Sequence, residues 1–383
     1  MIAAILYLLC SVGYLLFIVW VLRGLHQLRL PRHGETRPTV SIVIAARDEE
    51  QNLPYCLGTL LKQSYPRELL EILVVDDHST DATRAAAERI AAKYPSVRVL
   101  GAPPLSDDSA PKKSALAAGI AAAGGEIILT LDADCSAPPQ WVEKMSTLFG
   151  RGVAAVASWV LIPEEKSLPA RIELLDALAL QLIGAAAIGW NRPFLANGAN
   201  LAFRRSRFLE IGGYAGFAHM GSGDDDLFIQ KLGRNGGTLL FNSDPEATVT
   251  TFPCTSWRHF FQQRIRWGSK SALYPAWIRG LEAGLFGYYL ALLFGLPLAL
   301  ICSFPLWIPP AALLFKLACD AFLMRRGIHM VRRSWNWPAF VLASLLHLVY
   351  IPVIGVLGLF GRFEWKGRSY HKGRITTAAV AGR

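Results

Sequence analysis

Short apolar runs alternate with helix-like stretches between residue 39 and about residue 245. Runs of this length that are rich in Ile, Leu and Val are typical of buried strands. The segments between them include DATRAAAERIAAKY and KKSALAAGIAAA. This β-α-β-α order predicts an α/β domain in which helices cover both faces of a mostly parallel sheet. The strand candidates are residues 40–46, 71–77, 97–102, 126–134 and 154–162.

The first apolar run, residues 2–22, contains no charged side chain. A helix of this length crosses the ~30 Å of hydrocarbon in a bilayer. A cleaved signal peptide is the alternative interpretation, but the run has no basic segment before it and no small-residue cleavage site. We therefore expect an N-terminal transmembrane helix within residues 1–24.

Three further apolar runs follow the α/β region, at about residues 284–303, 306–323 and 338–361. Before them, residues 251–282 interleave aromatic, basic and apolar side chains, as helices in a membrane interface do. If the α/β domain is cytoplasmic, three crossings would leave the basic carboxyl-terminal residues outside, against the usual charge bias. Prolines interrupt the runs, so one of them could be re-entrant or interfacial, and the number of crossings stays open.

Composition and charge support a membrane location. The chain is 52% hydrophobic with a mean hydropathy of +0.32, which is too apolar for a wholly soluble enzyme. Its formal net charge is +10, and the basic residues cluster beside the apolar runs. Basic loops of this kind mark the cytoplasmic side of a membrane and attract anionic headgroups. We expect an integral protein of the inner or plasma membrane whose α/β domain is cytoplasmic.

Neither the basic charge nor the cysteines indicate a nucleic-acid or metal-binding module. Nucleic-acid binding could account for the charge, but no module for it is legible, so we expect no nucleic-acid partner. The six cysteines show no spacing typical of metal sites, and we interpret them as reduced. No Gly-rich phosphate loop is present, which disfavours P-loop and dinucleotide-binding proteins.

Two pairs of acidic residues close apolar runs. Asp76 and Asp77 end the run 71–77, where a carboxylate can accept a hydrogen bond from a base or ribose; capping a turn is the alternative role. Asp132 and Asp134 are separated by one small residue, which puts both side chains on the same side of a strand end. Such a pair suits an octahedral, oxygen-ligated cation that bridges a diphosphate, although a solvated turn has the same pattern.

A third acidic cluster and a lysine pair supply further candidates. Asp224, Asp225 and Asp226 open a predicted helix, whose dipole stabilises acids at that end. Three adjacent carboxylates also repel, which can raise the pKa of one toward the range of a general base. Lys112 and its neighbour Lys113 precede another helix and could neutralise phosphate; a solvated basic face is the alternative.

The segment QRIRW combines an amide, a guanidinium and an indole at helical spacing. Gln263, Arg266 and Trp267 fall on one face of a helix. Arginine can bind a departing diphosphate, and tryptophan offers a flat surface to a sugar or a lipid headgroup. An ordinary interfacial helix would show the same pattern.

The ordered acids and QRIRW together resemble the D, DxD, D, QxxRW series of membrane-bound family 2 glycosyltransferases with the GT-A fold. VSIVIAARDEEQNL, VVDDHSTDAT, LTLDADC, PFLANGANLAFRRSRFLEIGGY and SGDDDLFIQKLGRNGG carry the resemblance over about residues 38–270. It implies five parts. They are an N-terminal transmembrane helix (1–24), a GT-A catalytic domain (38–250), interfacial helices (251–282), a carboxyl-terminal transmembrane region (283–362) and a basic tail (363–383).

The resemblance also implies roles for residues. Asp76 and Asp77 would contact the nucleoside, and Asp132 and Asp134 would hold a metal diphosphate with Mg²⁺ or Mn²⁺. The other residues implied at the donor are Ala45, Arg47, Glu49 and Lys112.

Two segments depart from the family pattern. Ala45-Ala46-Arg47-Asp48 stands where a proline and an asparagine before the acid are usual. The base motif usually reads Glu-Asp-x-x-Leu; alignment on Leu227 places Gly223 at the glutamate and Asp224 at the base, whereas a slip of one nominates Asp225.

The family mechanism is a single displacement with inversion. Asp224 would deprotonate an acceptor hydroxyl, while the cation and Arg266 stabilise the nucleoside diphosphate leaving group. We expect a UDP-sugar donor and a membrane-lipid acceptor at the cytoplasmic face. A processive or short-polymer polysaccharide synthase is the alternative, although three or four spans are few for a translocation channel. A nucleotidyltransferase would leave QRIRW without a purpose, and a scaffold or transporter would leave the ordered acids unexplained.

Overall fold

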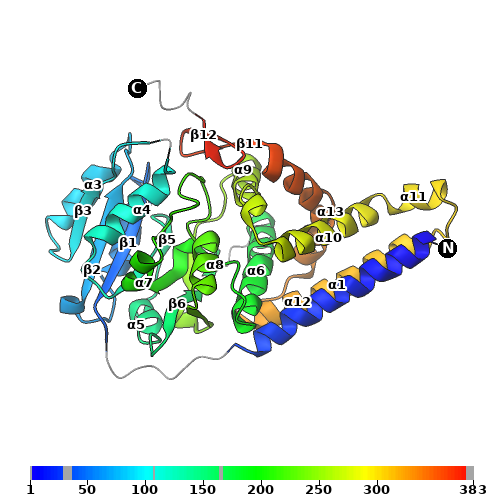
Figure 1. The fold of residues 1–383 in the computed structure, drawn as a ribbon, viewed down its shortest axis with the longest axis horizontal. Helices are drawn as coiled ribbons and strands as arrows, with labels where there is room; N and C mark the ends of the chain where they lie inside the picture. The colour runs from blue at the N-terminus through cyan, green and yellow to red at the C-terminus, as the bar shows by residue number, and fades with distance from the viewer. Residues whose placement is uncertain (1, 29–36, 107, 164–166, 377–383) are drawn as a thin grey trace.

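The computed structural model describes residues 2–28, 37–106, 108–163 and 167–376 of the chain, which is coloured from blue to red in Figure 1. Its centre is a seven-stranded sheet with the order β3-β2-β1-β4-β8-β6-β9. Neighbouring strands are parallel except at β8, which is antiparallel to both β4 and β6. The strands are β1 (Val40–Ala46), β2 (Leu70–Asp76), β3 (Val97–Gly101), β4 (Ile127–Thr130), β6 (Val153–Ser158), β8 (Leu201–Arg204) and β9 (Thr238–Asn242).

Helices cover both faces of this sheet, as the alternating pattern predicted (Figure 1). Successive side chains of a strand point to opposite faces, so Val43 of β1 belongs to one apolar core while Ile42 and Ile44 belong to the other. The first core includes residues of α4 and α6, and the second includes residues of α2 and α5. The helices around the sheet are α2 (Leu53–Leu60), α3 (Thr83–Ala91), α4 (Pro111–Ala122), α5 (Trp141–Ser146), α6 (Leu168–Gly189), α7 (Arg205–Glu210) and α8 (Asp226–Arg234).

Two of the expected strands differ from the prediction. β4 ends at Thr130, so Asp132 and Asp134 lie in the turn that leads to β5 (Cys135–Ser136) instead of on one side of a strand end. The run 154–162 forms two strands, β6 and β7 (Val160–Leu161), in different sheets. β7 pairs with β10 (Val249–Thr251), because the carbonyl of Trp159 accepts a backbone hydrogen bond from Val249 and the chain turns into the smaller sheet there.

A bundle of long helices packs against one side of the α/β core. It contains α1 (Ile2–His26), α9 (Trp257–Gly268), α10 (Ala276–Leu293), α11 (Gly295–Ile301), α12 (Ile308–Met330) and α13 (Trp337–Phe360). In Figure 1, α1, α10 and α12 form an arm that extends away from the sheet, whereas α13 stays beside α9 and α6.

Several helices of the protein are long and apolar enough to cross a membrane. Among the described residues they are α1, α6 and α13, together with the pair α10–α11, which is bent by 69°. The expected run 284–303 therefore falls on a broken helix. The run 306–323 falls on α12, which carries Lys316, Asp320, Arg325 and Arg326 and does not join that set. α6 was not predicted as a candidate span; it lies mostly inside the structure.

Residues 362–375 form a small antiparallel sheet where the sequence pattern predicted only a basic tail. Its strands are β11 (Arg362–Trp365), β12 (Arg368–His371) and β13 (Arg374–Ile375). β11 and β12 are joined by Lys366 and Gly367, with φ angles of 51° and 70°. Two successive residues with positive φ form the tight turn that matches the twist of a β-hairpin. Figure 1 shows this hairpin between α9 and the central sheet.

Candidate functional site

The carboxyl ends of β1 and β2 bring the first predicted residues together. The register pairs Ala45 with Val75, and Ala46 with Asp76, at the end of the two parallel strands. The carboxylate of Asp76 accepts a hydrogen bond from the Ser79 backbone N–H over 3.4 Å, so Asp76 caps the following turn. Asp77 is 4% exposed, and its backbone N–H donates to the Ala46 carbonyl.

The β11–β12 hairpin covers this strand edge. The guanidinium of Arg368 donates to both carboxylate oxygens of Asp77, over 2.6 and 3.1 Å. At the turn, the Lys366 ammonium lies 2.6 Å from a carboxylate oxygen of Glu49. Arg47 joins the two segments, because it donates to the carbonyls of Asp77 and Lys366 over 2.8 and 3.0 Å. The predicted residues Arg47, Glu49 and Asp77 therefore meet a segment of the expected basic tail.

Sequence reasoning missed Lys366 and Arg368 as members of this cluster, because basic residues beside an apolar run also fit membrane headgroups. A local signal was present in WKGR, since a Lys-Gly pair between residues of extended backbone favours a two-residue hairpin turn. No local signal specified that the hairpin would pack on a strand edge 291 positions away.

Lys112 connects the second and third acidic clusters. Its ammonium lies 2.8 Å from a carboxylate oxygen of Asp132 and 3.2 Å from one of Asp224. Burial lowers the pKa of Lys112, but the charges of Asp132 and Asp224 outweigh burial and hold it above its ordinary value. Lys112 thus stays charged and holds the LTLDADC turn against the segment that precedes α8.

Asp134 lies in the most negative part of the cluster. Burial, together with the nearby carboxylates of Asp132 and Glu49, raises the pKa of Asp134 to about 6. The described residues contain no group of three His, Cys, Asp or Glu side chains that could hold a metal ion.

The three acids before α8 have different surroundings. Asp225 caps α8, since its carboxylate accepts hydrogen bonds from the backbone N–H groups of Asp226 and Gly198, over 2.8 and 3.1 Å. Asp226 is fully buried and is held by Lys270 at 2.6 Å and by the hydroxyl of Tyr274. Sequence reasoning missed both Lys270 and Tyr274, which lie beyond QRIRW.

The pKa directions correct one expectation about this cluster. One member does have a raised pKa, but it is Asp226, through burial and the charge of Asp225. Burial also acts to raise the pKa of Asp224, yet the Lys112 ammonium holds it below its ordinary value. Asp224 is consequently an ionised carboxylate, and Lys112 lies between it and Asp132 of the DxD turn.

Lys113 points away from the acids that Lys112 contacts. Its ammonium donates to the carbonyls of Met220 and Ser222, and burial lowers its pKa to about 8. Lys113 therefore anchors the backbone that leads into the three acids, and of the pair only Lys112 contacts their carboxylates.

α9 presents the QRIRW residues to two different neighbours. Arg264, to which the motif assigned no role, is buried between the rings of Phe260 and Trp267, with its guanidinium 4.1 and 4.4 Å from their centroids. It pairs with Asp176 of α6 at 2.6 Å, and it donates to the side-chain oxygen of Gln263. Gln263 and Trp267 are thus held by Arg264 at the junction with the helix bundle.

Arg266 lies on the side of α9 that faces the hairpin. Its guanidinium is 4.8 Å from the centroid of the Trp365 ring. It is also close enough to Lys112 for its charge to act on the pKa of that lysine. Within the part of the chain that the structure describes, the buried Nε of Arg266 has no hydrogen-bond partner. A buried donor of this kind is costly unless a ligand satisfies it.

Comparison with known proteins points to one family. Residues 41–217 match the model for glycosyl transferase family 2. Glycosyltransferase AglE of Haloferax volcanii is 35% identical over 122 residues, which cover 32% of this chain and 39% of that protein. The probable glycosyltransferase YdaM of Bacillus subtilis is 27% identical over 244 residues, covering 60% and 54%. The chain thus spans about two fifths of the length of AglE and about half of the length of YdaM.

One further relative, named for a lipid product, and one solved structure are also similar to this chain. Beta-monoglucosyldiacylglycerol synthase of Synechocystis sp. is 31% identical over 114 residues, which cover 29% of this chain and 23% of that protein. The mannosyltransferase PcManGT from Pyrobaculum calidifontis, in complex with GDP-Man and Mn²⁺, superposes with a TM-score of 0.60 at 20% identity, covering 93% of this chain and 98% of that one. This likeness confirms the expected GT-A architecture.

Proposed function

We propose that this protein is an inverting family 2 glycosyltransferase that moves a sugar from a nucleotide-sugar to a membrane lipid. The observation that carries the proposal is the position of Lys112, whose ion pairs hold Asp132 of the DxD turn and Asp224 before α8 in one cluster. The family match over residues 41–217 supports the same reaction class.

The nucleoside would bind at the edge formed by β1 and β2. Arg368 uses two acceptor positions of the Asp77 carboxylate, and a carboxylate offers about four, so Asp77 can still accept a hydrogen bond from a base or ribose. Ala45, Arg47, Glu49 and Asp76 complete this edge. We infer a UDP-sugar as the donor.

A divalent cation, Mg²⁺ or Mn²⁺, fits Asp132 and Asp134. Both supply hard oxygen ligands. The pKa of Asp134 is raised first by burial and then by the charges of Asp132 and Glu49, and a cation would offset that negative charge. When bound, the cation would neutralise charge on the departing diphosphate. The presence of Mn²⁺ with GDP-Man in the PcManGT structure is compatible with this assignment.

The chain's own residues would accept the proton of the acceptor and stabilise the charge of the leaving group. Asp224 is ionised and buried, so it can accept the proton of an acceptor hydroxyl as that oxygen attacks the anomeric carbon. Arg266 would donate its unsatisfied Nε–H to the leaving diphosphate. Asp225 serves chiefly as the cap that fixes Asp224 at the start of α8, and Gln263 and Trp267 would lie toward the acceptor.

The acceptor would enter from the membrane side. The apolar helices α1 and α13 and the bent pair α10–α11 support attachment to the inner or plasma membrane. The match to a beta-monoglucosyldiacylglycerol synthase supports a lipid acceptor. The basic residues that cluster beside the apolar runs support the cytoplasmic face. A short-polymer synthase of the same family would use the same donor site and is distinguished by the number of sugars added.

The test is release of nucleoside diphosphate by membranes that contain the full-length protein, with a panel of UDP-sugars and GDP-mannose. We expect release with one donor, dependence on divalent cation, and a lipid product that carries one sugar. Asp134→Asn should lose both donor binding and turnover, whereas Glu88→Gln, which breaks an exposed ion pair on α3, should lose neither. Full activity of Asp134→Asn in excess chelator would contradict the metal assignment.

A further inference from the structure

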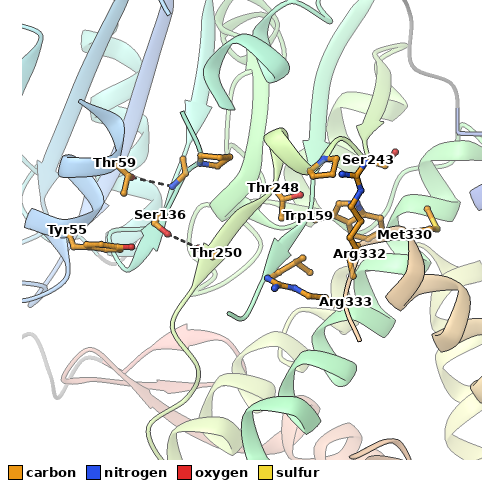
Figure 2. A pocket seen from close by; sticks show the side chains of 15 residues that line it. Tyr55, Thr59, Ser136, Trp159, Ser243, Thr248, Thr250, Met330, Arg332 and Arg333 are labelled. Carbon is orange, nitrogen blue, oxygen red and sulfur yellow. Dashed lines mark hydrogen bonds between the residues drawn. The ribbon is translucent and has the colours of Figure 1, made fainter. Parts of the chain in front are cut away.

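A cavity of about 440 Å³ lies between the α/β domain and the connection from α12 to α13 (Figure 2). Its volume falls within the ~300–1,000 Å³ of small-molecule sites in proteins. None of the residues proposed above for donor, metal or base lines it. Its polar lining consists of Tyr55, Thr59, Ser136, Ser243, Thr248, Thr250, Arg332 and Arg333.

The lining is chemically divided. Figure 2 shows Thr59, Ser136 and Thr250 toward one end and Arg332 and Arg333 toward the other. Among the described residues that line the cavity there is no Asp or Glu. Hydroxyl groups both donate and accept hydrogen bonds, and guanidinium groups bind phosphate. This combination suits a ligand that has hydroxyl groups at one end and a phosphate at the other.

The arginine end has the character of a membrane surface. Arg332 and Arg333 lie in the short connection that follows the end of α12 at Met330 and precedes α13. α13 begins at Trp337, a few residues after the two arginines, and the Trp337 side chain is 54% exposed. Exposed aromatic side chains gather at headgroup depth, and arginines there attract anionic lipids.

The hydroxyl end lies beside the proposed transfer site. The hydroxyls of Ser136 and Thr250 are hydrogen-bonded to each other over 2.6 Å across β5 and β10. β5 begins directly after Asp134, so this wall of the cavity continues from the DxD turn. The cavity therefore extends from beside the proposed metal carboxylates toward the ends of the apolar helices.

We propose that this cavity binds the headgroup of the acceptor, and that the acceptor is a lipid whose sugar or polyol headgroup is joined to it by a phosphate. Arg332 and Arg333 bind the phosphate, and the serine and threonine hydroxyls orient the hydroxylated part. This inference rests on the proposed lipid glycosyltransferase function and specifies its acceptor class.

Binding can be measured without any donor, with the full-length protein in detergent and short-chain lipids as probes. The probes are dioctanoyl phosphatidylinositol, dioctanoylglycerol with the same tails, and free inositol phosphate. We expect the phosphoinositide to bind, its Kd to rise at least tenfold in Arg332→Gln/Arg333→Gln, and dioctanoylglycerol to be insensitive to that change. Arg326→Gln, an exposed arginine of α12 that does not line the cavity, is the matched control and should keep the original Kd.

A second variant keeps the test decisive if substitution of Arg332 and Arg333 disturbs the folding of the connection between α12 and α13. Ser136→Ala/Thr250→Val removes two hydroxyls from the opposite wall and should also raise the Kd for the phosphoinositide. An unchanged Kd in both variants would overturn the cavity assignment. Equal affinity for free inositol phosphate would overturn the lipid source. Failure of the proposed function is seen separately, as absence of nucleoside diphosphate release from every donor when the Kd values behave as expected.

Discussion

At the scale of single residues, the pair of Asp77 and Arg368 joins the proposed donor site to the end of the chain. Both side chains are 5% exposed. Removing one partner of a buried pair leaves an uncompensated charge, which typically costs about 3–5 kcal/mol. We expect Arg368→Gln to lower the free energy of unfolding of the detergent-solubilised protein by this amount, which would be seen as a lower melting temperature.

A double-mutant cycle separates the pair from other effects of the substitution. Asp77→Asn in the Arg368→Gln background should recover part of the lost stability, because the buried charge disappears. Arg258→Gln breaks the exposed pair with Glu364 of the same hairpin and should change stability little, since exposed pairs contribute little. Equal losses for Arg368→Gln and Arg258→Gln would show that the Asp77 pair is not the stabilising contact.

Asp224 and Asp225 are distinguished by what each carboxylate contacts. Removal of a positioned general base typically lowers a rate by about 10²–10⁴-fold, so Asp224→Asn should lose transfer to that degree and still bind nucleotide. Asp225→Asn should retain most activity, because asparagine caps a helix about as well as aspartate. Turnover and donor affinity of both variants are the measurements. Loss of transfer only in Asp225→Asn would move the base to Asp225.

Site residues could be identified from the sequence where they belong to a local pattern. Asp77, Asp132 and Asp224 each follow or precede a recognisable run. Arg368, Lys270 and Tyr274 do not, because each contributes through a contact with a distant segment that propensity and periodicity do not encode. The prediction of a strand through Asp134 was wrong: β4 ends at Thr130, the last residue paired with β8, and the apolar Leu131 gave the run an apparent continuation.

At the scale of elements, the β11–β12 turn determines whether Lys366 and Arg368 reach their partners. Gly367 has a φ of 70°, and an added side chain in this backbone region costs of the order of 1 kcal/mol or more. We expect Gly367→Ala to weaken the binding of nucleoside diphosphate several-fold, measured by calorimetry, through displacement of the hairpin. Gly58→Ala in α2, where a Cβ meets open space, is the control and should leave binding unchanged.

Elements with a clear period were predictable, and elements set by their neighbours were not. β1 has the predicted bounds, because Val40–Ala46 is apolar at every position except Ser41 and lies between polar segments. α6 is as apolar as a membrane helix, yet it packs against α1, α12 and the sheet, so its role depends on tertiary contacts. The hairpin after α13 was hidden by its basic charge, which suggested a tail at the membrane surface.

At the scale of the whole molecule, both flanks of the helix bundle return to the α/β domain. α9 follows β10 and packs on β11, and β12 places Arg368 on Asp77. We therefore predict that the segment between these contacts crosses the membrane an even number of times. An even number would remove the conflict of three crossings that the apolar runs presented. In the arrangement that we predict, the bent pair α10–α11 crosses outward and α12 returns, with α13 beside the α/β domain. α12 carries more charged residues than the candidate spans, and its Lys316 is paired with Asp320 at 2.6 Å.

The far end of this arm provides the test of that topology. The ring of Tyr7 near the start of α1 contacts Phe304 at 5.7 Å between centroids, so the connection from α11 to α12 lies at the end of α1 remote from the sheet (Figure 1). α12 has 23 residues and is therefore roughly 35 Å long. This length exceeds the ~30 Å of hydrocarbon in a bilayer. Cys302 in that connection is exposed.

Labelling of Cys302 therefore reports on which side of the membrane the arm ends. In sealed right-side-out vesicles, a membrane-impermeant maleimide should label the protein, and Cys302→Ser should abolish the labelling. A tag after Arg383 should become accessible only after permeabilisation. Labelling that requires permeabilisation would mean that α10–α11 is re-entrant, and a tag accessible from outside would show an odd number of crossings.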